Sequence, residues 1–151
     1  MHREPIVRDP SAHDERAWRS LWEGYNHFYR TVVPAAVTAE TWRRILDPAA
    51  PIFARLVEKD TEVVGFAAWV LHEGTWSIAP VCYLEDLFVA EAARSGGIGR
   101  MLVEDLIVRA RRAGWANIYW HTRADNLPAR RLYDHFARAD DFVRYRMMLR
   151  P

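Results

Sequence analysis

Two adjacent acidic residues, Glu85 and Asp86, interrupt an otherwise apolar run from Tyr83 to Val89. Such a run is typical of a β-strand, in which a carboxylate needs a partner because an unpaired buried charge is costly. The two acids can pair with arginine, or one of them can act as a general base. Strand alternation turns their side chains to opposite faces, unless a bulge re-aims one of them.

A glycine-rich segment follows this strand and reads Arg-Ser-Gly-Gly-Ile-Gly-Arg from Arg94 to Arg100. Its glycines fall where a helix is expected to begin, and the first turn of a helix offers unpaired backbone N–H groups and partial positive charge. A phosphate can approach such a backbone closely. The spacing is neither a Walker loop nor the Rossmann fingerprint. A phosphate site and a flexible turn that caps a core helix both remain possible.

Tyr133 and His121 could also carry chemistry, but each has a structural explanation. Tyr133 shares helical spacing with Ala129 and Phe136, and periodicity alone indicates a core tyrosine. His121 can act as a base, but a structural histidine is the favoured interpretation. The histidines lack metal-binding spacing, and Cys82 is expected to be a small buried hydrophobe. We therefore expect no metal.

The elements that must position these residues follow the order β-α-α-β-β-β-α-β-α-β. This order predicts an α/β (α+β) fold with a mixed sheet and a central parallel strand pair, because a helical crossover joins parallel neighbours. The predicted strands cover residues 6–8, 53–57, 63–71, 81–89, 117–122 and 142–149. The predicted helices run from an N-cap at Ser11 to about 32, from Thr38 to 46, from 98 to 113 and from 128 to 136.

Length and composition limit the class of protein. The chain has 151 residues, 50% of them hydrophobic, which predicts a single domain over 1–151. A net charge of +1 argues against nucleic acid as a partner. No uncharged stretch reaches the roughly 18 residues of a membrane span, and the N-terminus lacks the pattern of a signal peptide. We expect a soluble, cytoplasmic protein without a membrane partner.

The spacing Arg-x-x-Gly-x-Gly at Arg94, Gly97 and Gly99 resembles the acetyl-CoA signature of the GNAT N-acetyltransferase superfamily. The segment from Asn126 to Tyr133 resembles the Asn-(x)-Ala-x-x-x-Tyr segment that this superfamily places beside the CoA thiol. The resemblance extends over residues 6–149, and the run from Tyr83 to Asp86 is most similar to the diamine and Hpa-type branch. Two residues depart from the pattern where relatives have glycine: Ser95, which should be tolerated, and Asp141.

The resemblance implies a sheet with splayed central strands and direct acetyl transfer from acetyl-CoA in a ternary complex. It implies that Glu85 or Asp86 is the general base; Glu85 is preferred, and the other acid is left to hold a cationic substrate. It implies that Tyr133 protonates the departing thiolate, and that backbone N–H groups near Phe88 and Val89 polarise the thioester. The implied cofactor-binding residues are Leu87, Phe88, Val89, Arg94, Ser95, Gly96, Gly97, Ile98, Gly99, Arg100, Asn126, Ala129 and Tyr133.

The acceptor pocket of such folds is lined by the first two helices and the hairpin, and the predicted substrate contacts are Tyr25, Tyr29, Trp76 and Glu85. Aromatic rings can hold a cationic amine, although most of these rings have core spacing. A primary amine of a small molecule, such as a polyamine or an amino acid, is the favoured acceptor. The alternatives are a protein lysine or N-terminal acetyltransferase and a non-catalytic acyl-CoA-binding regulatory module. Alternating residues over 142–149 predict a homodimer.

Overall fold

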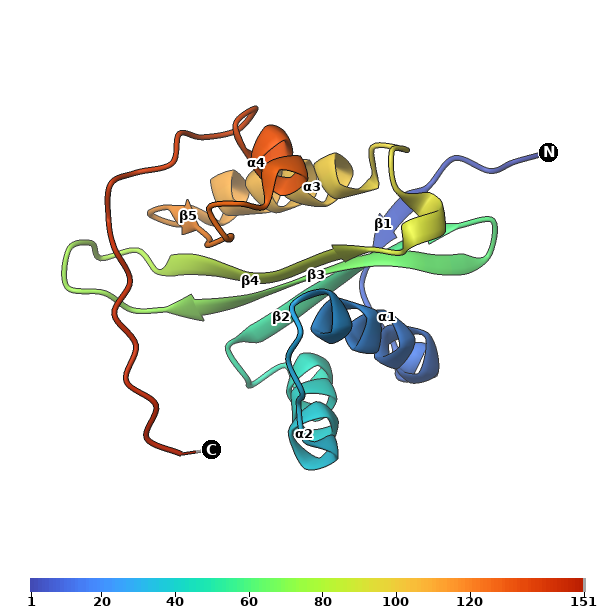
Figure 1. Cartoon of the computed structure of the whole chain (residues 1–151), viewed down its shortest axis with the longest axis horizontal. Coiled ribbons are helices and arrows are strands. Elements are labelled where there is room, and N and C mark those ends of the chain that lie inside the picture. The colour runs from blue at the N-terminus through green and yellow to red at the C-terminus, as the bar shows by residue number, and fades with distance from the viewer. Residues whose placement is uncertain (151) are drawn as a thin grey trace. The chain divides into compact units, whose positions relative to one another are not determined.

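A five-stranded mixed sheet with strand order β1-β2-β3-β4-β5 forms the centre of residues 1–121 (Figure 1). The computed structural model describes residues 1–150. Neighbouring strands are antiparallel from β1 to β4, and β5 runs parallel to β4, as the sequence predicts. The strands are β1 (Ile6–Arg8), β2 (Ile52–Lys59), β3 (Glu62–His72), β4 (Val81–Val89) and β5 (Ile118–Tyr119).

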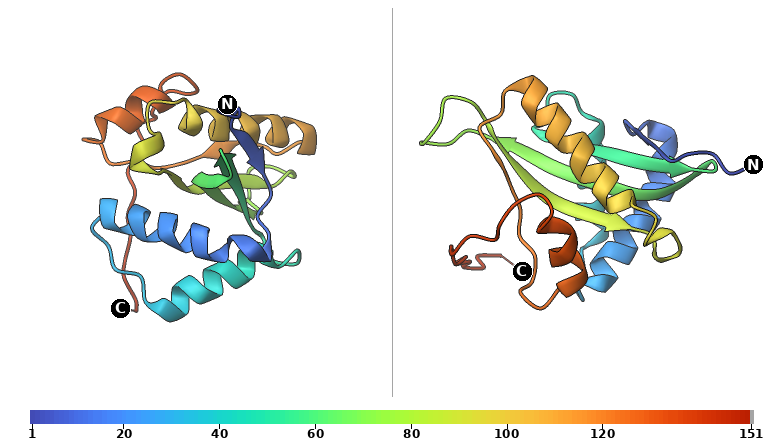
Figure 2. Two further views of the ribbon diagram at one scale, coloured as in Figure 1. Left: turned by 90° about the vertical axis from the view of Figure 1, so that its right-hand side faces the viewer. Right: turned by 90° about the horizontal axis from the view of Figure 1, so that it is seen from above.

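Helices cover both faces of this sheet (Figure 2). Helices α1 (Glu15–Phe28) and α2 (Ala35–Leu46) lie on one face, and α3 (Ile98–Ala113) lies on the other. Short 3₁₀ helices, η1 (Ala12–Asp14) and η2 (Glu91–Ala93), precede α1 and α3. The second compact unit begins at Thr122 and contains α4 (Leu127–Tyr133).

Stacked tryptophans fill the core between the sheet and its first two helices. Trp18 is fully buried, and its ring lies 5.1 Å from that of Trp42 and 5.3 Å from that of Trp22. The indole N–H of Trp22 donates to the buried Thr38 hydroxyl at 3.0 Å. Thr38 therefore ties α1 to α2, and the prediction that it begins the second helix was wrong: α2 begins at Ala35, after Pro34.

The opposite face buries the apolar stripe of α3 against β3 and β4. Leu102 and Leu106 of α3 pack with Trp69 and Cys82 in this cluster. Cys82 is fully buried, as predicted, and burial raises the pKa of its thiol to about 12. Gly114, in a left-handed conformation, ends α3 where the sequence places the end of that helix.

Four other predicted elements differ from the structure. The strand predicted over 142–149 is absent, and its apolar side chains are exposed, for example Tyr145 at 93%, because residues 142–150 have no strand to pair with. The strand predicted over 117–122 is reduced to β5. The helix predicted from Ser11 to about 32 is also shorter, since a 3₁₀ turn precedes α1 and Phe28 ends it. Helix α4 ends at Tyr133 rather than at 136.

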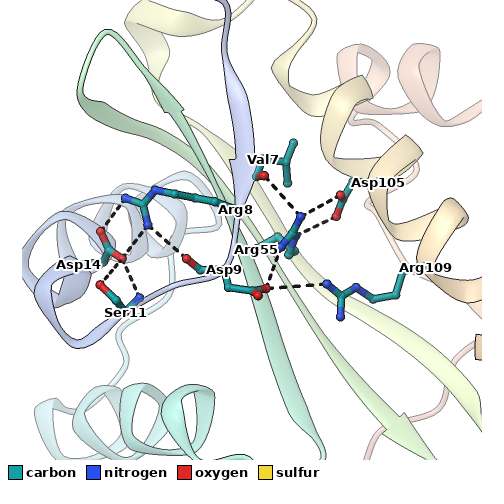
Figure 3. Close-up of polar contacts among 8 residues, drawn as sticks. All are labelled: Val7, Arg8, Asp9, Ser11, Asp14, Arg55, Asp105 and Arg109. Carbon is teal, nitrogen blue, oxygen red and sulfur yellow. Dashed lines mark hydrogen bonds and ion pairs between the residues drawn. The ribbon is translucent and has the colours of Figure 1, made fainter.

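Ion pairs connect the N-terminal strand, β1, to elements on both faces of the sheet (Figure 3). The Arg8 guanidinium makes two bonds to the Asp14 carboxylate, at 2.8 and 2.9 Å, and one to Glu58 at 2.7 Å. Arg55 bonds to Asp9 at 2.7 Å and to Asp105 of α3 at 3.1 Å. These bidentate contacts join β1, η1, β2 and α3 around one edge of the sheet.

We expect Asp14→Asn to lower the free energy of unfolding by about 2 to 3 kcal/mol at pH 7, because it removes the buried carboxylate that pairs with half-buried Arg8. The bond from Arg8, reinforced by Ser11, lowers the Asp14 pKa to about 2. This stabilisation is complete above the unfolded pKa of about 4 and is lost as the pH falls toward 2. Urea unfolding at pH 7 and pH 3 measures it. Asp125→Asn, at an exposed ion pair, is the control; an equal loss there would contradict the assignment.

Candidate active site

A β-bulge in β4 decides where the two acidic side chains lie. Trp69 of β3 pairs with Leu84, but the preceding β3 residue, Ala68, pairs with Asp86, so Glu85 is an extra residue. Leu84 therefore faces α3, while Asp86 shares the face of Ala68, which belongs to the α1 and α2 core. The bulge that the sequence analysis names as an exception to strand alternation is therefore present. It turns the Asp86 side chain to the face opposite that of Leu84.

The two acids differ in exposure. The Glu85 side chain is exposed, whereas Asp86 is only 9% exposed. Burial, and next the charge of Glu85, raises the pKa of Asp86 to about 7, although the nearby Tyr25 hydroxyl opposes the shift. Burial also raises the pKa of Glu85. Asp86 can thus exchange a proton near neutral pH, as a general base must.

Helix α1 supplies the aromatic side of this site. The Tyr25 hydroxyl donates to the backbone carbonyl of Glu85 at 3.2 Å, and the Tyr25 ring meets that of Tyr29 edge-on at 5.0 Å. Burial, followed by the neighbouring charge of Asp86, raises the pKa of Tyr25, so its phenol stays protonated and can donate. The structure thus brings together Tyr25, Tyr29, Glu85 and Asp86, all of which the sequence analysis selected.

Trp76 lies outside this group. It is 93% exposed in the loop between β3 and β4, beyond the last strand pair, His72 with Val81. Asp86 pairs with Ala68, well along the strands from that loop. The structure therefore does not bring Trp76 to the two carboxylates, and the predicted substrate contact loses its geometric basis.

A glycine that the sequence analysis did not select shapes the site. A Cβ atom on Gly24 of α1 would lie 3.0 Å from two ring carbons of Phe88, so this glycine lets Phe88 approach the helix. A glycine inside a helix lowers stability by about 1 kcal/mol relative to alanine. The close approach of the Phe88 ring explains why glycine is present here. An isolated glycine within the helical pattern was the available signal.

The far end of β4 has an open edge. Pairing with β5 involves only Cys82 and Tyr83, although β4 continues to Val89, so the parallel strands separate as predicted. The Ala90 N–H donates to Val64 of β3 at 2.8 Å. By alternation, the backbone groups of Leu87 and Val89 point to the open edge, where an amide-containing chain can add like a strand. The side chains of Leu87 and Val89 pack in the α3 core, so only their backbone can serve a ligand.

The glycine-rich segment turns directly into α3. Gly97 is the N-cap residue, with φ of 78°, and the first helical bond joins the Met101 N–H to the Gly97 carbonyl. The N–H groups before Met101 therefore remain for another acceptor. Ile98 is buried in the core, so its contribution is also through the backbone. An exposed loop with this shape fits a diphosphate.

The arginines on either side of this loop have different surroundings. The Arg94 guanidinium lies 5.3 Å from the Phe88 ring centre and 5.9 Å from that of Phe28, and its Nε donates to the Val89 carbonyl at 3.1 Å. Arg100 forms an exposed ion pair with Glu104 at 2.9 Å. Both keep positive charge near the helix start.

Ser95 adopts a left-handed conformation, with φ of 70°, at the position where relatives have glycine. A side chain in this region costs about 1 kcal/mol or more, so the substitution that the sequence analysis expected to be tolerated carries backbone strain. The strain lies within the loop that approaches the helix start.

We expect Gly97→Ala to weaken acetyl-CoA binding several-fold, because a Cβ disfavours the left-handed turn that presents the helix start. No atom lies within 4 Å of the added Cβ, so conformation alone is tested. Gly114→Ala is the matched control: its φ is 73°, its Cβ also meets nothing within 4 Å, and it lies at the other end of α3. Both should lose about 1 kcal/mol of stability. Equal binding losses, measured by calorimetry, would remove the loop from this role.

The second unit carries the remaining predicted residues. Asn126 is the N-cap of α4: its side chain accepts from the Ala129 N–H at 3.4 Å and donates to the Thr122 hydroxyl at 3.2 Å. Tyr133 is the last residue of this helix and is half-buried. The cap gives Asn126 a structural role within the unit. The role of Tyr133 remains a prediction.

Two observations concern other kinds of site. Within residues 1–150, no three His, Cys, Asp or Glu side chains are grouped as metal ligands would be. No helix in that same range is long and apolar enough to cross a bilayer. His121 packs edge-on against Tyr83 at 5.5 Å, and its structural interpretation remains a prediction.

Known proteins resemble this chain over nearly its whole length. Residues 16–137 match the acetyltransferase (GNAT) family. The chain is 37% identical over 144 residues to D-amino-acid N-acetyltransferase HPA3 of Saccharomyces cerevisiae, covering 93% of this chain and 89% of that protein. The chain belongs to the GNAT acetyltransferase family. The predicted family is thereby confirmed, and this GNAT protein is an N-acetyltransferase that transfers acetyl groups to amines.

Solved structures confirm the fold of this GNAT acetyltransferase. The ribosomal-protein-alanine N-acetyltransferase of Brucella melitensis biovar Abortus 2308 superposes with a TM-score of 0.78 at 18% identity, covering 97% of this chain and 100% of that one. The aminoglycoside N-acetyltransferase AAC(6')-Iy, solved with a CoA-containing bisubstrate analogue, gives a TM-score of 0.81 at 18% identity, with 97% and 99% covered. The GNAT family uses acetyl-CoA as the acetyl donor.

Proposed function

We propose that this GNAT protein transfers an acetyl group from acetyl-CoA to a primary amine of a small molecule by direct attack in a ternary complex. The observation that carries this proposal is the placement of buried Asp86 beside Tyr25, next to the open edge of β4. A base and free backbone groups on β4 thereby lie beside aromatic rings supplied by α1. Acetyl-CoA supplies the thioester whose acetyl group is transferred.

Asp86, rather than Glu85, is the general base in this proposal. An alkyl-ammonium ion has a pKa of about 10.4, so most of the acceptor must lose a proton before it can attack. A carboxylate with a pKa of about 7 accepts that proton more readily than an ordinary one, and about half of it is still ionised at pH 7. Exposed Glu85 holds the cationic acceptor and keeps the Asp86 pKa raised. This proposal replaces the preference for Glu85 given in the sequence analysis.

The other groups act on the donor. The N–H groups of Leu87 and Val89, at the open edge of β4, bind the amide groups of acetyl-CoA and polarise its thioester carbonyl. The start of α3, with Gly97 as its cap, holds the diphosphate, and Arg94 and Arg100 add positive charge. Tyr133 donates its phenolic proton to the departing thiolate. This role comes to Tyr133 from its match to the family segment.

The acceptor is an amino acid or a polyamine. HPA3 acts on D-amino acids, which supports an amino acid as acceptor. The carboxylates and aromatic rings of the site support any cationic amine. A protein lysine or a protein N-terminus is the alternative acceptor, and an acyl-CoA-binding regulatory module is the non-catalytic alternative.

We place this activity in a single acetyltransferase domain over 1–151, in a cytoplasmic protein. We also propose a homodimer. Exposed Val143, Tyr145 and Met147 alternate with arginines in a segment that has no strand to pair with, and such a segment can complete a partner's sheet. A monomeric mass in solution at micromolar concentration would contradict the dimer.

The activity is tested by incubating the protein with acetyl-CoA and a panel of amines while thiol release is followed. The panel spans polyamines, D- and L-amino acids, aminoglycosides and lysine peptides. Release with one class of small amine, with the acetylated product identified by mass spectrometry, supports the proposal. Release with lysine peptides alone favours the protein acceptor. Measurable acetyl-CoA binding without release from any amine favours the regulatory module.

A further inference from the structure

A set of aromatic rings, three exposed and one half-buried, lies on the same face of the sheet as Asp86. His72 of β3, Tyr83 of β4 and Tyr119 of β5 lie on neighbouring strands, and His121 follows β5. Before the bulge, Cys82 and Leu84 face α3, so Tyr83 between them points to the α1 and α2 face. We call His72, Tyr83, Tyr119 and His121 the ring platform.

The ring platform is fixed in place by its own contacts. The rings of Tyr83 and Tyr119 stack with centres 5.0 Å apart and planes 12° apart. His121 meets Tyr83 edge-on at 5.5 Å and Tyr119 at 6.0 Å. His72, Tyr119 and His121 are exposed and Tyr83 is half-buried, so the stacked and edge-on rings offer a ligand an aromatic surface.

A hydrogen-bond chain orients Tyr119. His72 Nδ1 lies 2.8 Å from the Glu73 backbone carbonyl, which can only accept, so Nδ1 carries a proton. Nε2 of the neutral ring therefore accepts from the Tyr119 hydroxyl at 2.9 Å. The Tyr119 phenol is thus committed as a donor to His72, and what it presents to a ligand is its ring.

The charge beside the ring platform is negative. Burial, the Cys82 sulfur and the Glu85 carboxylate raise the pKa of Tyr119, which places Glu85 within electrostatic reach of its ring. Glu85 is exposed, and Asp86 follows it on the platform's face. Stacked aromatic rings with a nearby carboxylate attract a cation and repel an anion.

We infer that the ring platform, together with Glu85, is a subsite for a second cationic group of the acceptor, separated by an aliphatic spacer from the amine that is acetylated. This inference rests on the proposed function and specifies its substrate class. A free diamine and an amino acid with a cationic side chain share this chemistry. In either case the second cation lies over Tyr83 and Tyr119 while the reacting amine reaches Asp86.

Two matched pairs of acceptors test the subsite. We expect kcat/KM to be about 3- to 30-fold higher for 1,4-diaminobutane than for 1-aminobutane, and for D-lysine than for D-norleucine, because each pair differs by one ammonium group. A preference in one pair alone identifies the source of the cation. Equal values in both pairs would overturn the inference and leave the proposed function standing.

Substitutions then locate the preference. Tyr119→Leu and Tyr83→Leu should bring the charged-to-neutral ratio close to one, whereas Tyr119→Phe, which keeps the ring and loses only the bond to His72, should largely preserve it. The ratio is insensitive to partial unfolding, since misfolded protein lowers both rates equally. A ratio unchanged in both leucine variants would place the cation elsewhere and overturn the inference.

If no acceptor releases thiol, the proposed function fails. A binding measurement then tests the subsite by itself. Calorimetric titration in the presence of CoA then compares 1,4-diaminobutane with 1-aminobutane. Tighter binding of the diamine, lost in Tyr119→Leu, supports the subsite without catalysis. Equal binding overturns the subsite as well.

Discussion

Replacing Asp86 with asparagine is expected to lower kcat/KM for the amine acceptor by about 100-fold or more, while acetyl-CoA still binds. The amide has nearly the same shape as the carboxyl group but cannot take a proton from the ammonium ion. Buried Asp86 packs with the α1 face of the sheet, so the substitution conserves volume there. Steady-state kinetics and a calorimetric titration with acetyl-CoA measure the two effects. An Asp86→Asn variant with undiminished kcat/KM would remove this residue from the reaction.

The pH dependence of kcat/KM distinguishes the two acids. With a pKa of about 7 for Asp86, activity should rise as the pH increases through neutrality, because the ionised form is the active one. Glu85→Gln removes a neighbouring negative charge, so the Asp86 pKa falls and the rise moves to lower pH. Tyr25→Phe removes a hydroxyl that lowers the Asp86 pKa, so the rise moves to higher pH. If the limb instead disappears in Glu85→Gln, Glu85 is the base.

Tyr133→Phe is expected to lower kcat by about 10- to 1000-fold with little change in the KM for acetyl-CoA. Phenylalanine keeps the ring but has no proton to give to the thiolate. The matched control is Tyr145→Phe in the same unit, where the side chain is 93% exposed and no part in the reaction is proposed. Unchanged turnover in Tyr133→Phe, or an equal loss in both variants, would remove Tyr133 from its assigned role.

Much of the fold could be predicted because periodicity and end signals act locally. The run 81–89 and the stripe of α3 were placed at their observed bounds, and Gly114 marked the end of that helix. The acidic pair and the glycine-rich loop were selected because the predicted strand and helix do not require these residue types. Family resemblance then gave these local features a common chemistry.

What escaped prediction depends on contacts between distant residues. The bulge at Glu85 exists in the pairing of β4 with β3, and a single strand's sequence does not display it. Thr38 resembles a helix cap, but its hydroxyl accepts a hydrogen bond from a tryptophan of another helix. The segment 142–149 alternates as a strand would, yet a strand forms only where a neighbouring edge accepts its hydrogen bonds. A local sequence pattern shows that a segment can form a given element. Contacts with other parts of the chain decide whether the element forms.

Direct transfer from acetyl-CoA to an amine is the central claim, and the intact mass of the protein tests it. The protein is mixed with acetyl-CoA, first alone and then with an amine identified by thiol release, and protein and products are weighed by mass spectrometry. We predict an unmodified protein in both cases, and equal amounts of CoA and N-acetylated amine only when the amine is present. A protein that becomes acetylated without the amine and then passes the group to it would contradict direct transfer.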